Sequence, residues 1–469
     1  MMNGNLRLPI RRLVGASALA LSLAAPVLAQ SPYTPVAEEF TGGLYAAPSG
    51  GTAIYPGSAA TISGYGLIPG QEITLMRGNT VLNPDGPLIA NDEGEVSFDL
   101  TVDEEAALGL QPIVAIAENP AAATVFELKV SPQVPLSGED LFEIASQPVV
   151  PGLYQVIYNE SSDALYVTSS VGRPPISQSE LVKLSPETLE IVGRATPPAA
   201  PARPDGSDGG LFGVYGVWVD DTNGHVWATT TRQDSLAVYD KDDLSLVKQF
   251  DSGSVTHPRD VVIDEGRGRA YVSTSFTKAI NVFDTNSLEP LEPIEITSTV
   301  RGEEFGARSI AVYPEAGKLF SASLNTPEVA VVDLDSGEVR VLPLPGAKAS
   351  SDAAYDPQDG LIFVASQASD NLLIVSEETG EVLHDVTVGA GALSVAFEPV
   401  SRRAFVANRG AGTITVVNTD GEIVANLEAG SYPNHVRADG KGNVWAVNKS
   451  QGQDDPNGDR IWRITAVAR

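Results

Sequence analysis

The repeat that decides the fold is clearest in residues 394–418, SVAFEPVSRRAFVANRGAGTITVVN. An apolar segment at 394–397 leads through a turn to a second apolar segment centred on Phe405. A polar loop then precedes a third segment that ends at Val417-Asn418. Short apolar segments separated by turn-forming residues are typical of antiparallel strands. This stretch therefore predicts consecutive short β-strands.

The aromatic segment recurs seven times in the last two-thirds of the chain. The central aromatics lie 61, 44, 49, 43, 42 and 40 residues apart, and they are Tyr166, Trp227, Tyr271, Phe320, Phe363, Phe405 and Trp445. A unit of about 42 residues with four short strands is a propeller blade, and seven such units make a closed ring. We expect the aromatics to pack between blades. The first spacing is lengthened by a Pro/Gly/Ala-rich insert at 197–210, which predicts a surface loop.

The two ends of the repeat region complement each other. The last unit stops after its third apolar segment, at 460–465, and an unassigned apolar segment at 141–145 precedes the first unit. We expect 141–145 to supply the missing outer strand, because that pairing closes the ring and removes an exposed edge. The seven-bladed β-propeller is thus predicted over residues 139–469.

A separate small domain is predicted over residues 47–132. The candidate strands have turn signals between them about every 8 to 12 residues, and they lie at 61–63, 72–76, 95–100, 112–116 and 124–128. The turns at 66–71 and 90–95 resemble those of the immunoglobulin-like (Ig-like) β-sandwich modules of exported bacterial proteins. We therefore expect an all-β chain in which a β-sandwich, serving as a spacer or in adhesion, precedes the propeller.

Residues 1–29 have the pattern of a signal peptide. Arg7, Arg11 and Arg12 precede an apolar run at 13–28, and Val27-Leu28-Ala29 ends in a small residue suited to cleavage. A retained membrane anchor is the alternative, but the run is short for a span and contains Pro26. We expect a polar leader over 30–46, no membrane span in the mature chain, and a periplasmic or secreted protein.

The composition excludes several classes of function. Sixty Asp and Glu residues against 30 Lys and Arg give a net charge of −30 over 469 residues. Such a charge opposes general binding to nucleic acid or anionic membranes. The chain has no Cys, its four His lie in different repeats, and it contains no Gly-x-Ser-x-Gly, His-Glu-x-x-His or phosphate-loop motif. We expect no catalytic residues of these kinds, no bound metal and no other cofactor.

Two acidic loops, at 205–209 and 454–459, have the composition of calcium ligands. Neither has the oxygen-ligand spacing of a calcium hand, so solvated turns are the simpler interpretation.

The predicted blade arrangement assigns the charged residues to one or the other rim of the propeller. Loops that enter the first strands share one rim with loops between second and third strands, and propellers usually bind ligands there. The basic residues assigned to this rim are Arg232, His257, Arg259, Lys278, Arg308, Arg409, His435 and Lys449. The positive charge of this rim is partly offset by Asp260, Asp352 and Asp370, and the opposite rim is acidic. We expect the basic rim to bind a protein or an anionic ligand, the alternative being that these are ordinary solvated loop ends.

Single-stranded nucleic acid is a less favoured ligand for the same rim. Its bases would need exposed aromatic rings for stacking. The candidate rings are Tyr154, Phe212, Tyr215, Phe276 and Tyr432.

The repeats resemble a known family. Tyr166-Val167-Thr168, Tyr271-Val272-Ser273 and Phe405-Val406-Ala407-Asn408, each followed by a Val-Val-Asp-like strand and a Thr/Ser-Gly-Glu turn, resemble the YVTN-repeat family of seven-bladed β-propellers. Gly152-Leu153-Tyr154 and Tyr432-Pro433-Asn434-His435 are similar to an exported enterobacterial branch of it. The resemblance covers residues 139–469 and implies a scaffold for binding, with no reaction common to the family.

Two functions follow from these observations. The first is an exported, non-catalytic binding protein. The alternative is a hydrolase or lyase of the lactonase type, since other seven-bladed propellers use carboxylates and a His around the channel. His257, Asp260, Asp352 and His435 would then carry the reaction, which requires them to converge in the channel mouth.

Overall fold

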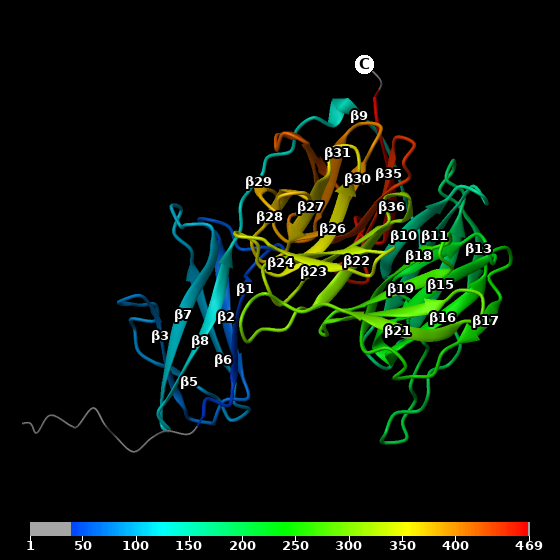
Figure 1. Cartoon of the computed structure of the whole chain (residues 1–469). Helices are drawn as coiled ribbons and strands as arrows, with labels where there is room; N and C mark the ends of the chain where they lie inside the picture. Colours follow the sequence, from blue (N-terminus) through cyan, green and yellow to red (C-terminus); the bar gives the residue numbers. More distant parts are fainter. Residues whose placement is uncertain (1–38, 468–469) are drawn as a thin grey trace, which may run out of the picture.

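The computed structural model describes residues 39–467, which form antiparallel strands and almost no helix (Figure 1). The three helices in this range are single 3-10 turns, η1 (Glu139–Leu141), η2 (Thr231–Gln233) and η3 (Pro314–Ala316). The all-β class is therefore confirmed. None of the described helices has the length and apolar character that crossing a membrane requires. The predicted signal peptide, 1–29, lies outside the described residues.

The N-terminal module consists of two sheets around one core. One sheet contains β1 (Gly43–Pro48), β2 (Ala59–Tyr65) and β6 (Val96–Thr101). The other contains β4 (Thr80–Val81), β3 (Glu72–Arg77), β7 (Gly109–Glu118) and β8 (Ala122–Val130), with β5 (Leu88–Ile89) also paired to β3. Alternate residues of facing strands are buried together, among them Ile62, Ile73, Leu75 and Ile113. Because side chains alternate across a strand, each sheet contributes one apolar face to this sandwich.

The predicted start of this module was wrong. β1 begins at Gly43, inside the segment assigned to the polar leader, and pairs along its whole length with β2 from Gly43 opposite Tyr65. A short edge strand that begins with Gly and ends with Pro lacks the usual strand pattern. Its hydrogen bonds to β2, which the sequence pattern does not reveal, make it a strand.

Seven four-stranded antiparallel sheets follow, and we number them in chain order. Sheet 1 contains β10 (Leu153–Asn159), β11 (Ala164–Val171), β12 (Gln178–Leu184) and β13 (Ile191–Ala195). Sheet 2 contains β14 (Val217–Asp220), β15 (His225–Thr230), β16 (Ser235–Asp240) and β17 (Leu246–Gln249). Sheet 3 contains β18 (Pro258–Asp264), β19 (Arg269–Thr274), β20 (Ala279–Asp284) and β21 (Glu289–Glu295). Sheet 4 contains β22 (Ala307–Tyr313), β23 (Lys318–Ser323), β24 (Glu328–Asp333) and β25 (Val339–Pro343).

The last three sheets complete the series. Sheet 5 contains β26 (Ser350–Asp356), β27 (Leu361–Ser366), β28 (Asn371–Ser376) and β29 (Val382–Thr387). Sheet 6 contains β30 (Ala392–Glu398), β31 (Arg403–Asn408), β32 (Thr413–Asn418) and β33 (Ile423–Glu428). Sheet 7 contains β34 (Pro433–Ala438), β35 (Asn443–Asn448), β36 (Arg460–Ala466) and, from before sheet 1, β9 (Phe142–Pro148).

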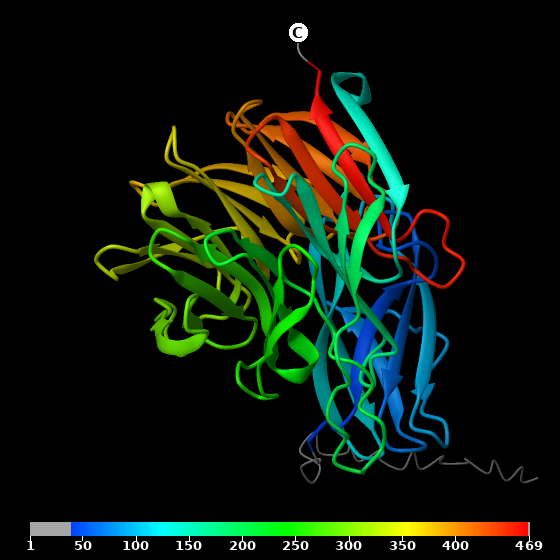
Figure 2. The same cartoon turned by 90° about the vertical axis from the view of Figure 1, so that its right-hand side faces the viewer.

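The first strands of these sheets form a closed ring. They contact one another in the order β10, β14, β18, β22, β26, β30 and β34, and β34 contacts β10 again. Sheet 7 is completed by β9, whose Ile144 lies opposite Ile464 of β36, and Figure 2 shows this cyan strand beside the red one. The arrangement is that of a propeller whose two chain ends share one sheet.

The seven repeated aromatics all lie in the apolar core, as predicted. Each is at most 4% exposed. Phe363 of sheet 5 stacks on Phe397 of sheet 6 at 4.9 Å between ring centroids, and Phe320 of sheet 4 stacks on Tyr355 of sheet 5 at 4.5 Å. These contacts hold neighbouring sheets face to face.

The sandwich lies against the ring beside sheets 5 and 6 (Figure 1). Lys129 of β8 donates hydrogen bonds to Asp370 Oδ1 at 2.5 Å and to the carbonyl oxygen of Gln367 at 2.8 Å. The Thr52 hydroxyl donates to the carbonyl oxygen of Gly410. The loops that carry Asp370 and Gly410 follow second strands, so the module lies on the rim of the ring where those loops emerge.

We expect Phe363→Ala to lower the free energy of unfolding by about 3 to 5 kcal/mol, because it empties a fully buried site between two sheets. Chemical denaturation followed by intrinsic fluorescence measures this loss. Val400→Ala, at a side chain that is 66% exposed, is the control and should change stability little. Equal stability of the two variants would contradict the packing role.

Candidate functional site

A β-bulge near the start of the first strand occurs in six of the seven sheets. Pairing between first and second strands shifts there in every sheet except sheet 2. The residues at the bulges are Tyr154 and Gln155, Arg259 and Asp260, Arg308, Ser351, Leu393 and Asn434. A bulge turns a side chain out of the strand ladder. Most of these side chains line a cavity at one end of the ring.

Hydroxyl groups of three second strands bind the starts of the first strands. Ser273 Oγ accepts a hydrogen bond from Asp260 N at 2.9 Å and donates to the carbonyl oxygen of Arg308, in the next sheet, at 3.0 Å. Thr229 and Thr168 each form an equivalent pair of hydrogen bonds. The bonds of Thr229 join sheet 2 to sheet 3, and those of Thr168 join sheet 1 to sheet 2. Each hydroxyl thus ties the start of its own sheet's first strand, which is bulged in sheets 1 and 3, to the following sheet.

Sheet 2 has a glycine where the other sheets carry a bulge side chain. A Cβ atom on Gly216 would collide with the carbonyl oxygen of Arg259 in sheet 3. The close approach of the two backbones at this point therefore requires glycine.

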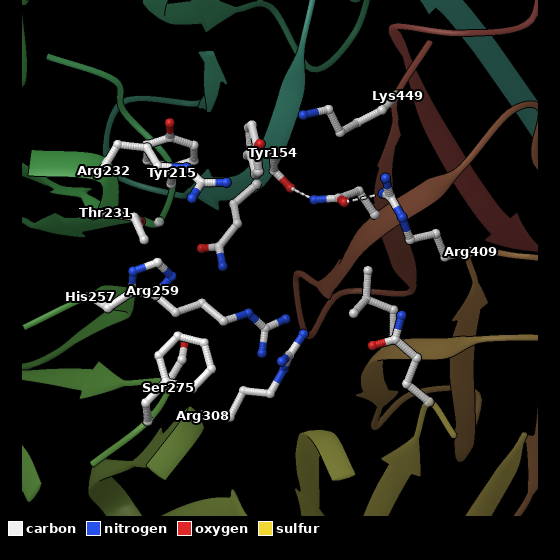
Figure 3. A pocket seen from close by; sticks show the side chains of 16 residues that line it. Tyr154, Tyr215, Thr231, Arg232, His257, Arg259, Ser275, Arg308, Arg409 and Lys449 are labelled. Carbon is white, nitrogen blue, oxygen red and sulfur yellow. Dashed lines mark hydrogen bonds between the residues drawn. The ribbon is translucent and has the colours of Figure 1, made fainter. Parts of the chain in front are cut away.

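The cavity has a volume of about 290 Å³ and is open to solvent (Figure 3). We call it the mouth cavity; it is lined by Tyr154, Gln155, Tyr215, Gly216, Thr231, Arg232, His257, Arg259, Ser275, Phe276, Arg308, Gln367, Leu393, Arg409, Asn434 and Lys449. Five of these residues are Arg or Lys, and no Asp or Glu is among them. The lining is therefore strongly cationic in a chain that is acidic overall.

The cations of the mouth cavity have few negative partners. Arg259 Nη1 donates to the carbonyl oxygen of Ser351, two sheets away, at 2.6 Å, and its Nε lies 3.9 Å from Asp260 Oδ1. Arg409 Nη1 donates to Asn434 Oδ1 at 2.7 Å. Within residues 39–467, Arg308 forms no ion pair and its buried Nε has no hydrogen-bond partner. Arg232, Arg409 and Lys449 also form no ion pair with any described carboxylate.

The electrostatic cost of this arrangement appears in the pKa values. Burial, and then the charge of Arg259, lower the pKa of Arg308. Burial, and then the charge of Arg409, lower the pKa of Lys449 to about 7, although Asp459 acts in the opposite direction. Both shifts show that positive charge is disfavoured here, because the cations are desolvated and repel one another.

Six of the eight predicted basic residues meet in the mouth cavity, and two do not. Lys278 is not among the residues that line it and pairs with Glu295 at 2.9 Å. His435 is buried beneath it, where its Nδ1 accepts a hydrogen bond from Val156 N at 3.3 Å. His435 follows the bulge residue Asn434, so strand alternation directs its ring inward. The assignment of Lys278 and His435 to this site is therefore corrected.

The four residues of the hydrolase or lyase hypothesis are held by different partners. Asp260 Oδ1 accepts from Gln155 Nε2 at 2.6 Å, whereas Asp352 Oδ2 accepts from Ser394 Oγ at 2.8 Å. Among the described residues no hydrogen bond joins any two of His257, Asp260, Asp352 and His435. The described part of the chain also has no cluster of three or more His, Cys, Asp or Glu side chains placed to hold a metal ion. Asp455 and Asp205, in the two acidic loops, accept hydrogen bonds from their own turns.

Sequence reasoning identified some lining residues and missed others. Of the five candidate aromatics, Tyr154, Tyr215 and Phe276 line the mouth cavity, and Phe212 and Tyr432 do not. The neutral polar lining residues were missed, namely Gln155, Thr231, Ser275, Gln367 and Asn434. Gln155 and Asn434 stand at the start of first strands, as Arg259 does, so their position in the repeat was the available signal.

Comparison with known proteins supports the fold. The sequence matches no family model. It is 23% identical over 319 residues to the uncharacterized protein YncE of Salmonella typhimurium, covering 65% of this chain and 84% of YncE, and to YncE of Salmonella typhi with the same values. The chain is thus weakly homologous to YncE, a propeller protein of the YVTN type.

Solved structures with this fold have diverse functions. The virginiamycin B lyase of Staphylococcus aureus, solved as a catalytically inactive variant with quinupristin, matches with a TM-score of 0.53 and 12% identity over 70% of this chain and 100% of that one. Hydrazine synthase of Kuenenia stuttgartiensis matches with a TM-score of 0.53 and 16% identity over 68% of this chain and 96% of that one. At these identities the likeness shows a propeller-like fold alone.

We expect Lys449→Met to stabilise the protein, and to do so more at pH 6 than at pH 9. The folded-state pKa of Lys449, about 7, lies below that of the unfolded chain. Below pH 7 both states are protonated and burying the charge has its full cost, which falls as the pH rises toward the unfolded value. A gain of about 1 to 3 kcal/mol at pH 6 is expected.

Urea denaturation at the two pH values measures this difference. Lys278→Met, at an exposed and paired lysine, is the matched control and should give no gain at either pH. A Lys449→Met gain that is equal at both pH values would show that the charge of Lys449 is not the cause.

Proposed function

We propose that this chain is an exported, non-catalytic binding protein in which an Ig-like module precedes a seven-bladed β-propeller. Its ligand is a small anion that binds in the mouth cavity. The seven four-stranded sheets and their ring of first strands support the blade count. The Arg-rich start and apolar run of residues 1–29 support export to the periplasm or beyond.

One observation carries the proposal: five cationic side chains converge on a cavity of about 290 Å³ with no carboxylate in its lining. Like charges brought together and desolvated destabilise the empty protein. The carboxylates of Asp260 and Asp352 lie nearby and offset only part of the charge of Arg308. An anion in the cavity would supply the missing negative charge.

The donor types indicate which anion the cavity suits. Arg259, Arg308 and Arg409 present planar guanidinium groups, which bind carboxylate and phosphate through paired hydrogen bonds. The rings of Tyr154 and Phe276 add apolar surface beside these groups. A carboxylate or phosphate on a short organic skeleton meets both features.

Hydrolase or lyase activity has less support than anion binding. It would need His257, Asp260, Asp352 and His435 to act on one bond. Three of the four are bound to separate partners, and Asp260 and His435 are buried below the cavity.

We expect the Arg259→Gln/Arg308→Gln double variant to bind citrate at least about 10-fold more weakly than the unmodified chain, because charge-assisted hydrogen bonds contribute about 1.5 to 3 kcal/mol each. Isothermal titration calorimetry at low and at physiological ionic strength measures the affinity. Binding to the unmodified chain should weaken as salt screens the charges.

The matched control is Lys278→Gln, which removes one cation outside the mouth cavity. It should bind citrate as the unmodified chain does. Equal affinity of the double variant, or binding that salt does not alter, would remove the mouth cavity as an anion site. Capture of a stoichiometric protein with no citrate binding would point instead to a protein partner.

A further inference from the structure

Lys449 differs from every other lysine of the chain. The sequence has nine lysines, all within the described residues. Six pair with carboxylates, Lys183 donates to a backbone carbonyl oxygen, and Lys348 is exposed. Among residues 39–467 the amino group of Lys449 alone is largely buried with neither an ion pair nor a hydrogen bond.

The backbone fixes the position of Lys449 in the mouth cavity. It follows β35 directly, and its N–H donates to the carbonyl oxygen of Tyr432 at 3.1 Å. Its Nζ lies over the ring of Tyr154, 3.5 Å from the ring centroid (Figure 3). The amino group is thus held against an aromatic face at the edge of the anion site.

The charges around Lys449 favour its neutral form. Arg409 in the loop after β31 and Arg232 in η2 repel its positive charge, whereas Asp459 before β36 attracts it. Asp459 Oδ1 is already bound by Gly152 N at 2.8 Å and Ser450 N at 3.2 Å. Burial and the two arginines outweigh Asp459, so a substantial fraction of Lys449 is uncharged at neutral pH.

We propose that Lys449 is a reactive amine that forms an imine with a small anionic carbonyl compound, one that carries a carboxylate or a phosphate beside an aldehyde or ketone. This inference rests on the proposed function, since the arginines of the mouth cavity would bind the anionic group and present the carbonyl carbon to Nζ. Desolvation beside other cations is an established way to keep a lysine amine neutral and therefore nucleophilic.

The chemistry needs only the two reactants. The lone pair of Nζ attacks the carbonyl carbon, and the carbon–oxygen π electrons move to oxygen, which takes up a proton. The resulting carbinolamine loses water and becomes a carbon–nitrogen double bond. The protonated imine is cationic, and the bound carboxylate or phosphate lies near enough to stabilise it.

The test uses glyoxylate as a carboxylate probe and pyridoxal 5′-phosphate as a phosphate probe, each with sodium cyanoborohydride. The reductant delivers hydride to the imine carbon and leaves a stable secondary amine, which peptide mass spectrometry locates. At pH 7 we expect labelling at Lys449 to be at least about 10-fold faster than at Lys278, because far more of Lys449 is unprotonated. Labelling at Lys449 should level off above pH 8, whereas labelling at Lys278 should keep rising.

Two variants and a neutral probe identify the cause of fast labelling at Lys449. Lys449→Arg keeps a cation and should bind glyoxylate reversibly while losing the fast label. The Arg259→Gln/Arg308→Gln variant should slow labelling by glyoxylate and leave labelling by the neutral glycolaldehyde unchanged. Preference for one probe over the other distinguishes a carboxylate ligand from a phosphate ligand.

The outcomes separate this inference from the proposed function. Equal labelling rates at Lys449 and Lys278, together with salt-dependent binding of glyoxylate, would overturn the reactive lysine and leave the anion site intact. Absence of both binding and preferential labelling would overturn both. Fast labelling of Lys449 by glycolaldehyde as well as by glyoxylate would overturn the anionic class of the carbonyl ligand.

Discussion

The hydroxyl bonds that tie the starts of the first strands of sheets 1, 2 and 3 to the next sheet are the constraint on which the mouth cavity depends. Thr168, Thr229 and Ser273 each bind their own first strand and the carbonyl oxygen of the next one. Without these bonds the extra residues could return to the ladder, and their side chains would point elsewhere. The cation cluster is therefore a property of the ring as a whole, since no single sheet can place it.

Two opposing contributions to the stability of the ring meet at the mouth cavity. Apolar packing between sheets, as between Phe363 and Phe397, stabilises the ring, whereas the crowded cations in its mouth destabilise it. Functional sites commonly retain such unfavourable groups, and the surrounding structure makes up for them. The lowered pKa values of Arg308 and Lys449 reflect the cost of burying these cations together.

Much of the fold could be read from the sequence because a repeat shows its pattern seven times. The spacing of the aromatics predicted their burial, and the incomplete last unit predicted a strand from near 141, although β9 runs from Phe142 to Pro148. The site was less accessible to such reasoning. Lys278 directly precedes β20 and pairs with Glu295, a contact that the repeat pattern does not reveal. The one-residue bulges that direct side chains such as Arg308 into the cavity also leave no mark in that pattern. The start of the sandwich was missed because β1 is a strand only through its hydrogen bonds to β2, which its own sequence does not reveal.

The route of the chain between its two parts has a mechanical consequence. The segment that leaves the sandwich pairs at Ser137 with Asn426 and continues within a few residues into β9, the strand that completes sheet 7. Tension that separates the sandwich from the ring would first load the Lys129–Asp370 ion pair and the Thr52 contact. Once these contacts and the Ser137–Asn426 pairing gave way, the pull would reach β9 and peel it from β36. Any tether attached through the N-terminal module would therefore transmit its load to the one seam that closes the ring.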